Sequence, residues 1–229
     1  MERSAEQVRE NYKRITDRIG EAMAKYRKPE EQVHLMAVTK TVDPALVNVA
    51  VECGVRLLGE NRVQEYESKK AQYDPRAQVQ FIGQLQTNKV KYLIPEISMI
   101  QSVDSLHLAN EVERIAARAD KVQDILLEVN IGGEESKGGI PAEELHGLLE
   151  EAARKPHLHV CGLMTIPPKT DVEKYFFRMQ KLFIDISAEN MDNIDMHVLS
   201  MGMSGDYVEA IKYGSTLVRI GSALFGARG

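Results

Sequence analysis

The chain has 229 residues, of which 43% are hydrophobic and 28% charged, as in an ordinary soluble globular protein with one sizeable core. Its net charge of -5 argues against a nucleic-acid-binding role, and no apolar run approaches the ~20 residues that span a bilayer. The charged N-terminus carries no secretory signal, so we expect a cytoplasmic protein without nucleic-acid or membrane partners.

The first predicted element is an amphipathic helix over residues 3–26, which ends before Pro29. Strand-like and helix-like segments alternate from there onward. Helices are expected to begin near Asp43-Pro44, Asp104-Ser105 and Pro141, where capping residues or prolines stand, and another covers residues 172–190. The expected strands cover residues 33–38, 56–59, 78–82, 99–103, 125–130, 158–163, 195–199 and 216–220.

Eight strands that alternate with helices predict parallel pairing through βαβ crossovers. In a chain of this length, eight units favour a closed (β/α)8 barrel of the TIM type, with an extra N-terminal helix, over an open doubly wound sheet. No linker rich in Gly, Pro or Ser interrupts the pattern, so we expect one domain over residues 1–229.

Polar residues gather directly after the predicted strands. In a (β/α)8 barrel these loops form the active face, and phosphate sites recur after strands seven and eight. The loop after strand seven and the Gly221-Ser222 pair after strand eight expose backbone N–H groups and hydroxyls, as in phosphate sites, although glycines there can also serve only tight turns. The residues that follow the strands include Lys40, Asn61, Gln84, Asn88, Asn130, Thr165, Ser200, Gly202, Ser204 and Gly205.

Lys40 directly follows an apolar strand, so its amine is expected to face the barrel mouth and to attack a carbonyl. Considered alone, a lysine at the end of a strand is more simply explained as a charged side chain in solvent. An amine beside a phosphate cradle suggests either pyridoxal 5′-phosphate (PLP) or a sugar phosphate in an aldolase. Arg219, within the last strand, needs a partner, which is the pyridine nitrogen, the phosphate or a carboxylate at the barrel rim.

The remaining chemistry-bearing residues show no motif. Cys53 and Cys161 are far apart and are expected to be buried free thiols, and the six histidines have no metal-ligand spacing, so no metal site is predicted. Neither GxGxxG nor GxxxxGK[ST] occurs, which removes the dinucleotide and P-loop interpretations.

Seven short motifs stand in register along the chain. They are residues 37–40 (AVTK), 59–61 (GEN), 81–89 (FIGQLQTNK), 136–140 (SKGGI), 162–167 (GLMTIP), 199–206 (LSMGMSGD) and 218–226 (VRIGSALFG). With these motifs, the sequence resembles the pyridoxal phosphate homeostasis protein family from about residue 5 onward. The Val79-Gln80 pair departs from the Trp-His that members of the family often carry.

The resemblance implies a fold similar to the N-terminal barrel of alanine racemase, with PLP held as a Schiff base on Lys40 and Arg219 facing the pyridine nitrogen. It further implies that Asn61 lines the ring pocket and that the PLP phosphate is held by residues of the last two loops, with Gly202 and Met203 also at the cofactor. The implied phosphate residues are Ser200, Ser204, Gly221 and Ser222.

The function implied by the resemblance is PLP homeostasis without an established catalytic reaction. We expect no second, β-rich domain of the racemase type, so Lys40 would serve one ring face only, whereas racemisation needs a proton carrier on each face. A weak amino-acid racemase remains the alternative, and a Schiff-base aldolase a more distant one. Expected partners are PLP and either PLP-dependent apoenzymes or free amino acids, with the chain a monomer or weak dimer.

Overall fold

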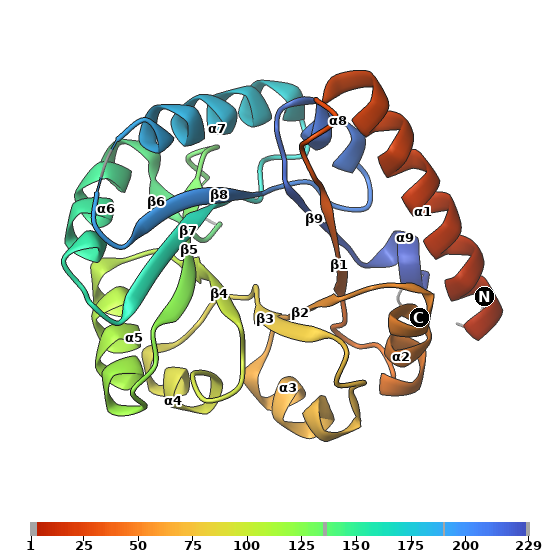
Figure 1. Ribbon diagram of the computed structural model, residues 1–229, viewed down its shortest axis with the longest axis horizontal. Coiled ribbons are helices and arrows are strands. Elements are labelled where there is room, and N and C mark those ends of the chain that lie inside the picture. Colours follow the sequence, from red (N-terminus) through yellow and green to blue (C-terminus); the bar gives the residue numbers. More distant parts are fainter. Residues whose placement is uncertain (1–3, 135–136, 190, 228–229) are drawn as a thin grey trace.

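The computed structural model describes residues 4–134, 137–189 and 191–227, and its strands form a closed parallel barrel (Figure 1). Eight strands follow one another around the ring, and the β4–β5 and β1–β9 pairings complete it. The predicted (β/α)8 barrel is therefore confirmed. The barrel strands are β1 (His34–Val38), β2 (Leu57–Glu60), β3 (Gln78–Phe81), β4 (Met99–Val103), β5 (Gln123–Asn130), β7 (Leu158–Met164), β8 (Ile194–Ser200) and β9 (Leu217–Ile220).

The helices lie outside the ring of strands and cover it (Figure 1). Side chains of Asp43 and Ser105 cap α2 and α5 by accepting hydrogen bonds from backbone N–H groups, as their sequence context predicts. The helices are α1 (Ala5–Tyr26), α2 (Pro44–Cys53), α3 (Val63–Lys69), α4 (Val90–Leu93), α5 (Leu106–Arg118), α6 (Leu145–Ala153), α7 (Val172–Ser187), α8 (Tyr207–Lys212) and α9 (Ser222–Phe225), with 3-10 turns at Lys70–Gln72, Thr87–Lys89 and Ala142–Glu144.

The extra N-terminal helix α1 packs across α2, α8 and α9 (Figure 1). Val8, Ile15 and Ile19 share one helix face and are buried in the apolar layer between α1 and the barrel. The buried Asn11 amide donates a hydrogen bond to the Leu224 carbonyl at 2.9 Å. This contact fixes α1 to the short helix that follows the last strand.

The helical segment predicted to begin near Pro141 begins at Ala142, as a 3-10 turn that leads into α6. Ile140–Pro141 form a two-residue strand, β6, that pairs with the end of β5, and α6 begins only at Leu145 after a 3-10 turn. Pro141 has φ -53° and ψ 140°, an extended conformation that proline adopts as easily as the first turn of a helix. Because β6 lies at the edge of the sheet, the missing proline N–H costs no ladder hydrogen bond.

Candidate functional site

A cavity of about 470 Å³ opens at the carboxyl-terminal end of the barrel, between the loops that follow β1, β8 and β9. It brings together six of the nine residues predicted for the cofactor site, together with Lys169 from the loop after β7. The six are Lys40, Met203, Ser204, Arg219, Gly221 and Ser222.

Lys40 lies in a turn whose two flanking residues are anchored. The buried Thr39 donates its hydroxyl to the Glu60 carboxylate at 2.7 Å, and the Thr41 N–H donates to the Glu65 carboxylate at 2.6 Å. Thr41 has φ +60°, in the left-handed region that a non-glycine residue enters only when its surroundings hold it there. The turn therefore positions the half-buried Lys40 side chain against the cavity.

Glu60 is a buried carboxyl group beside this turn. The sequence analysis assigned a role to its neighbour Asn61 but none to Glu60. Burial raises the pKa of Glu60, while hydrogen bonds from Tyr73 and Thr39 lower it. Among the described residues, its second oxygen Oε2 has no hydrogen-bond partner, and neither has the buried Oδ1 of Asn61. Asn61 is not among the residues that line the cavity, but its unpartnered acceptor lies directly beyond β2.

Ser204 connects the loop after β8 to the loop after β9. Its hydroxyl oxygen accepts hydrogen bonds from the backbone N–H groups of Gly221 at 3.3 Å and Ala223 at 3.1 Å. Two backbone donors thus converge on one oxygen atom at the wall of the cavity. An oxygen of a bound anion has the same acceptor character as this hydroxyl.

Gly202 allows the loop after β8 to adopt its backbone conformation. Its φ is +93°, and a Cβ atom there would lie 2.5 Å from the Ala210 Cβ atom of α8. The Gly202 carbonyl accepts the Arg219 N–H at 2.9 Å, so the residue packs between α8 and β9 without lining the cavity. Next to it, the Met203 N–H donates to the Asp206 carboxylate at 2.6 Å, which closes the turn.

Arg219 is buried, with 3% of its surface exposed, and its guanidinium is held by three hydrogen bonds. Nη1 donates to the Ser200 carbonyl at 2.8 Å and to the Ser200 hydroxyl at 2.6 Å, and Nη2 donates to the Thr165 carbonyl at 2.8 Å. Burial lowers the pKa of Arg219 to about 10, although Glu128 and Asp206 favour its charged form. The arginine is therefore a cation at neutral pH, and these hydrogen bonds run to carbonyls and a hydroxyl.

Ser200 lies behind Arg219. It is fully buried, accepts the arginine hydrogen bond and donates its own hydroxyl to Gln101 Oε1 at 2.7 Å. Gln101 in turn donates to Gln80 at 2.6 Å. This polar chain through the barrel interior was not foreseen from the sequence, where its signals were the polar side chains of Gln80 and Gln101 within two predicted strands.

Glu128 supplies a negative charge near Arg219, and in the sequence it stands as an ordinary residue of a predicted strand. Only 8% of its surface is exposed. Burial raises the pKa of Glu128 to about 7, although the Arg219 charge lowers it. The carboxyl group therefore changes its protonation state near neutral pH.

We expect this group to make the stability of the protein depend on pH. A carboxyl whose folded pKa lies above its unfolded value of 4.5 favours folding below pH 4.5, and this contribution is lost as pH rises through about 7. The loss is on the order of 3 kcal/mol. Urea unfolding at about pH 5, 6, 7 and 8 should show a steeper decline for the wild-type chain than for Glu128→Gln. Parallel profiles for the two proteins would contradict the assignment.

The predicted motif over residues 136–140 is described only in part, because its first residue, Ser136, lies outside the described residues. Across the described ranges, no helix is long and apolar enough to cross a membrane.

Known proteins resemble this chain over nearly its whole length. A family model for the N-terminal domain of alanine racemase matches residues 5–229. The pyridoxal phosphate homeostasis protein of Aquifex aeolicus is 42% identical over 224 residues, which cover 96% of this chain and 97% of that protein. The structure of PipY from Synechococcus elongatus with PLP bound has a TM-score of 0.80 at 29% identity, covering 93% of this chain and 100% of that one.

The barrel also resembles that of alanine racemase from Streptomyces lavendulae. The TM-score is 0.74 at 18% identity, with 99% of this chain and 58% of that chain covered. At this identity the likeness shows the fold, and it confirms the expected alanine racemase N-terminal architecture.

Proposed function

Because this chain belongs to the pyridoxal phosphate homeostasis protein family, we propose that it binds PLP in the cavity at the carboxyl end of the barrel and holds it as a Schiff base on Lys40. One observation carries the proposal: the same cavity is lined by a lysine, by a serine whose oxygen accepts two backbone N–H groups, and by a buried arginine. These are the groups required by an aldehyde, a phosphate and a ring nitrogen.

The residues fit such a cofactor at both ends. Ser204, Gly221 and Ser222 would hold the phosphate, since the Ser204 oxygen accepts the Gly221 and Ala223 N–H groups and its O–H can then donate to a phosphate oxygen. Lys40 and Lys169 add positive charge to the same cavity. Asn61 Oδ1 is a buried acceptor with no partner among the described residues, which suits a donor group on a bound ring.

We propose that the protein carries PLP and does not turn over an amino acid. PLP supplies an aldehyde that condenses with amines and a ring that withdraws electrons best when its nitrogen is protonated. The buried Arg219 is itself a cation, and a second positive charge facing it would be costly. Arg219 therefore favours a neutral ring nitrogen, which weakens electron withdrawal.

The openness of the cavity lets small amines reach bound PLP and exchange with Lys40. Lys40 is half-buried and Ser222 is exposed, so the cavity is open at its rim. A free amino acid is small enough to reach the attachment point. We therefore propose that bound PLP passes to amino acids or to PLP-dependent apoenzymes.

A weak racemase remains the alternative, because a second lysine, Lys169, lines the cavity and is a possible second proton carrier. Incubation of L-alanine with the protein in deuterated water tests it. We expect no exchange at the α-carbon above that caused by free PLP at the same concentration. Formation of deuterated D-alanine that disappears in Lys169→Ala would instead establish the racemase alternative.

Borohydride reduction tests the proposed attachment directly. Reduction of the PLP-loaded wild-type protein, digestion and mass spectrometry should place one phosphopyridoxyl group on the peptide that contains Lys40. Modification of the Lys169 peptide instead would refute the attachment to Lys40 while leaving PLP binding intact.

The phosphate contact is tested by Ser204→Ala. Removing the hydroxyl that bridges the two loops should weaken PLP binding about tenfold, equivalent to ~1.4 kcal/mol. Pyridoxal without the phosphate should bind wild type and variant equally weakly. An equal loss of affinity for both compounds would show that Ser204 acts on the fold of the loops and not on the phosphate.

A further inference from the structure

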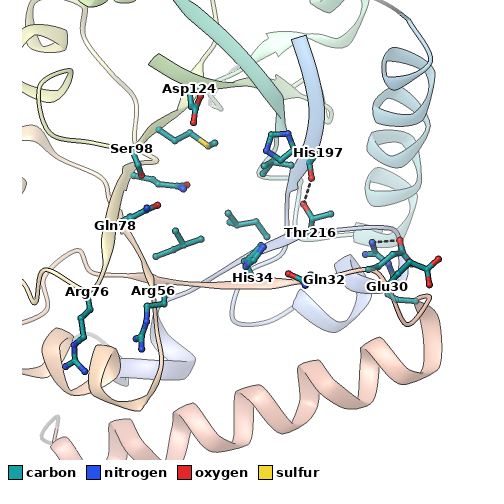
Figure 2. Close-up of a pocket in the computed structure, with 17 residues that line it drawn as sticks. Glu30, Gln32, His34, Arg56, Arg76, Gln78, Ser98, Asp124, His197 and Thr216 are labelled. Carbon is teal, nitrogen blue, oxygen red and sulfur yellow. Dashed lines mark hydrogen bonds and ion pairs between the residues drawn. The ribbon is translucent and has the colours of Figure 1, made fainter. Parts of the chain in front are cut away.

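A larger cavity, about 720 Å³, lies at the opposite end of the barrel from Lys40. Its walls include the first residues of several strands, among them His34 of β1, Gln78 of β3 and Met99 of β4. Because all barrel strands run parallel, this is their amino-terminal end. Figure 2 shows Asp124 and His197 among the side chains that line it.

Three side chains with metal-binding atoms meet beside Asp124. Asp124 on β5 is the register partner of His159 on β7, and Cys161 follows His159 by two residues, so it lies on the same face of the strand. The spacing along the chain forms no local motif, which is why the sequence predicted no metal site. The ligand atoms of Asp124, His159 and Cys161 all lie within 4.8 Å of one another.

The distances approach those of a coordination shell. His159 Nδ1 lies 3.4 Å from Cys161 Sγ and 2.9 Å from Asp124 Oδ1. A tetrahedral Zn²⁺ ion with bonds of ~2.0 Å to nitrogen and ~2.3 Å to sulfur holds those two ligands ~3.5 Å apart. The Cys161–His159 pair already has this spacing, and the His159–Asp124 distance is a few tenths of an ångström shorter than the ~3.3 Å between two ligand atoms bound at ~2.0 Å.

We propose that Asp124, His159 and Cys161 bind a borderline-soft divalent cation of the Zn²⁺ type, with water from the cavity in the remaining position. Thiolate and imidazole ligands select against Mg²⁺ and Ca²⁺, which prefer oxygen. Asp124 lines the cavity and gives the ion its entry route. Cys161 packs among Met99, Leu126 and Met164, which screens the sulfur from solvent.

The competing explanation is a hydrogen bond between His159 and Asp124 beside a thiol that binds no metal. Burial raises the pKa of Cys161, so the metal-free thiol keeps its proton and is unreactive. A bound Zn²⁺ ion displaces that proton. The two explanations therefore differ in whether the sulfur binds an added metal.

Titration of the full-length protein with Co²⁺ under anaerobic conditions separates them. We expect one equivalent to produce the near-ultraviolet band of Co²⁺–thiolate charge transfer, recorded as a difference against the same protein without Co²⁺. Added Zn²⁺ should abolish the band. Cys161→Ser should remove it and weaken Zn²⁺ binding, measured by competition with a chelating dye, by about 100-fold, since losing even an outer-shell partner costs ~10–100-fold.

Matched variants locate the site. Cys53→Ser, which removes the other cysteine, and Lys40→Ala, at the opposite end of the barrel, should both keep the band and the Zn²⁺ affinity. Asp124→Asn should weaken Zn²⁺ binding while keeping the thiolate band at higher Co²⁺. Absence of the band in the wild-type protein, its survival in Cys161→Ser, or its loss in Cys53→Ser would overturn the proposal.

Discussion

Replacing Lys40 by alanine should abolish borohydride-stable attachment of PLP, whereas replacing Lys169 should leave it in place. Both lysines line the same cavity, but they are held differently. Lys40 is half-buried in a turn anchored by Thr39 and Thr41, and Lys169 is exposed in the loop after β7. A fixed, partly desolvated amine is the better nucleophile for a bound aldehyde.

The measurement is the intact mass of each protein after loading with PLP and reduction. Wild type and Lys169→Ala should gain one phosphopyridoxyl group per chain, and Lys40→Ala none. Lys40→Arg separates charge from covalent bonding, because it keeps a cation near the phosphate but cannot form the Schiff base. An adduct on Lys40→Ala at wild-type stoichiometry would refute the proposed role of Lys40.

Most of the barrel could be predicted because its strands are apolar runs bounded by turn residues. The same pattern does not identify the first residues of a strand when they are polar. β5 begins at Gln123, two residues earlier than predicted, because Gln123 and Asp124 are polar although they belong to the strand. Asp124 faces the cavity at the amino-terminal end of the barrel, where a polar strand residue is satisfied by solvent and by His159.

The candidate site, too, could be predicted only in part. Lys40 and the two phosphate loops could be identified because each follows a strand, and the barrel gathers those loops at one end. The partners of Arg219 could not, because no local pattern shows which backbone carbonyl or hydroxyl a buried guanidinium will meet across neighbouring strands. Glu128 was missed since nothing in a local pattern shows that a carboxyl group will be buried beside that arginine.

Gly162→Ala should be among the most destabilising single substitutions in the barrel, at on the order of 4 kcal/mol or more. Gly162 lies in β7 opposite Val198 of β8, where the register of the two strands shifts. Its φ is +153°, and a Cβ atom there would lie 1.8 Å from the Val198 carbonyl oxygen. Because that neighbour is backbone, the clash is relieved only by separating β7 from β8.

The separation would reach the site, because β7 leads to Thr165 and β8 ends at Ser200, the two residues that hold the Arg219 guanidinium. Any Gly162→Ala protein that folds should therefore also bind PLP more weakly. Gly147→Ala is the matched control, since Gly147 is an exposed residue of α6 and a Cβ atom there would meet nothing within 4 Å. Urea unfolding should show Gly147→Ala stabilised by ~1 kcal/mol, because alanine is the better helix former. Equal unfolding midpoints for the two variants would mean that β7 and β8 tolerate a side chain at their closest approach, and that the position of Arg219 does not depend on their spacing.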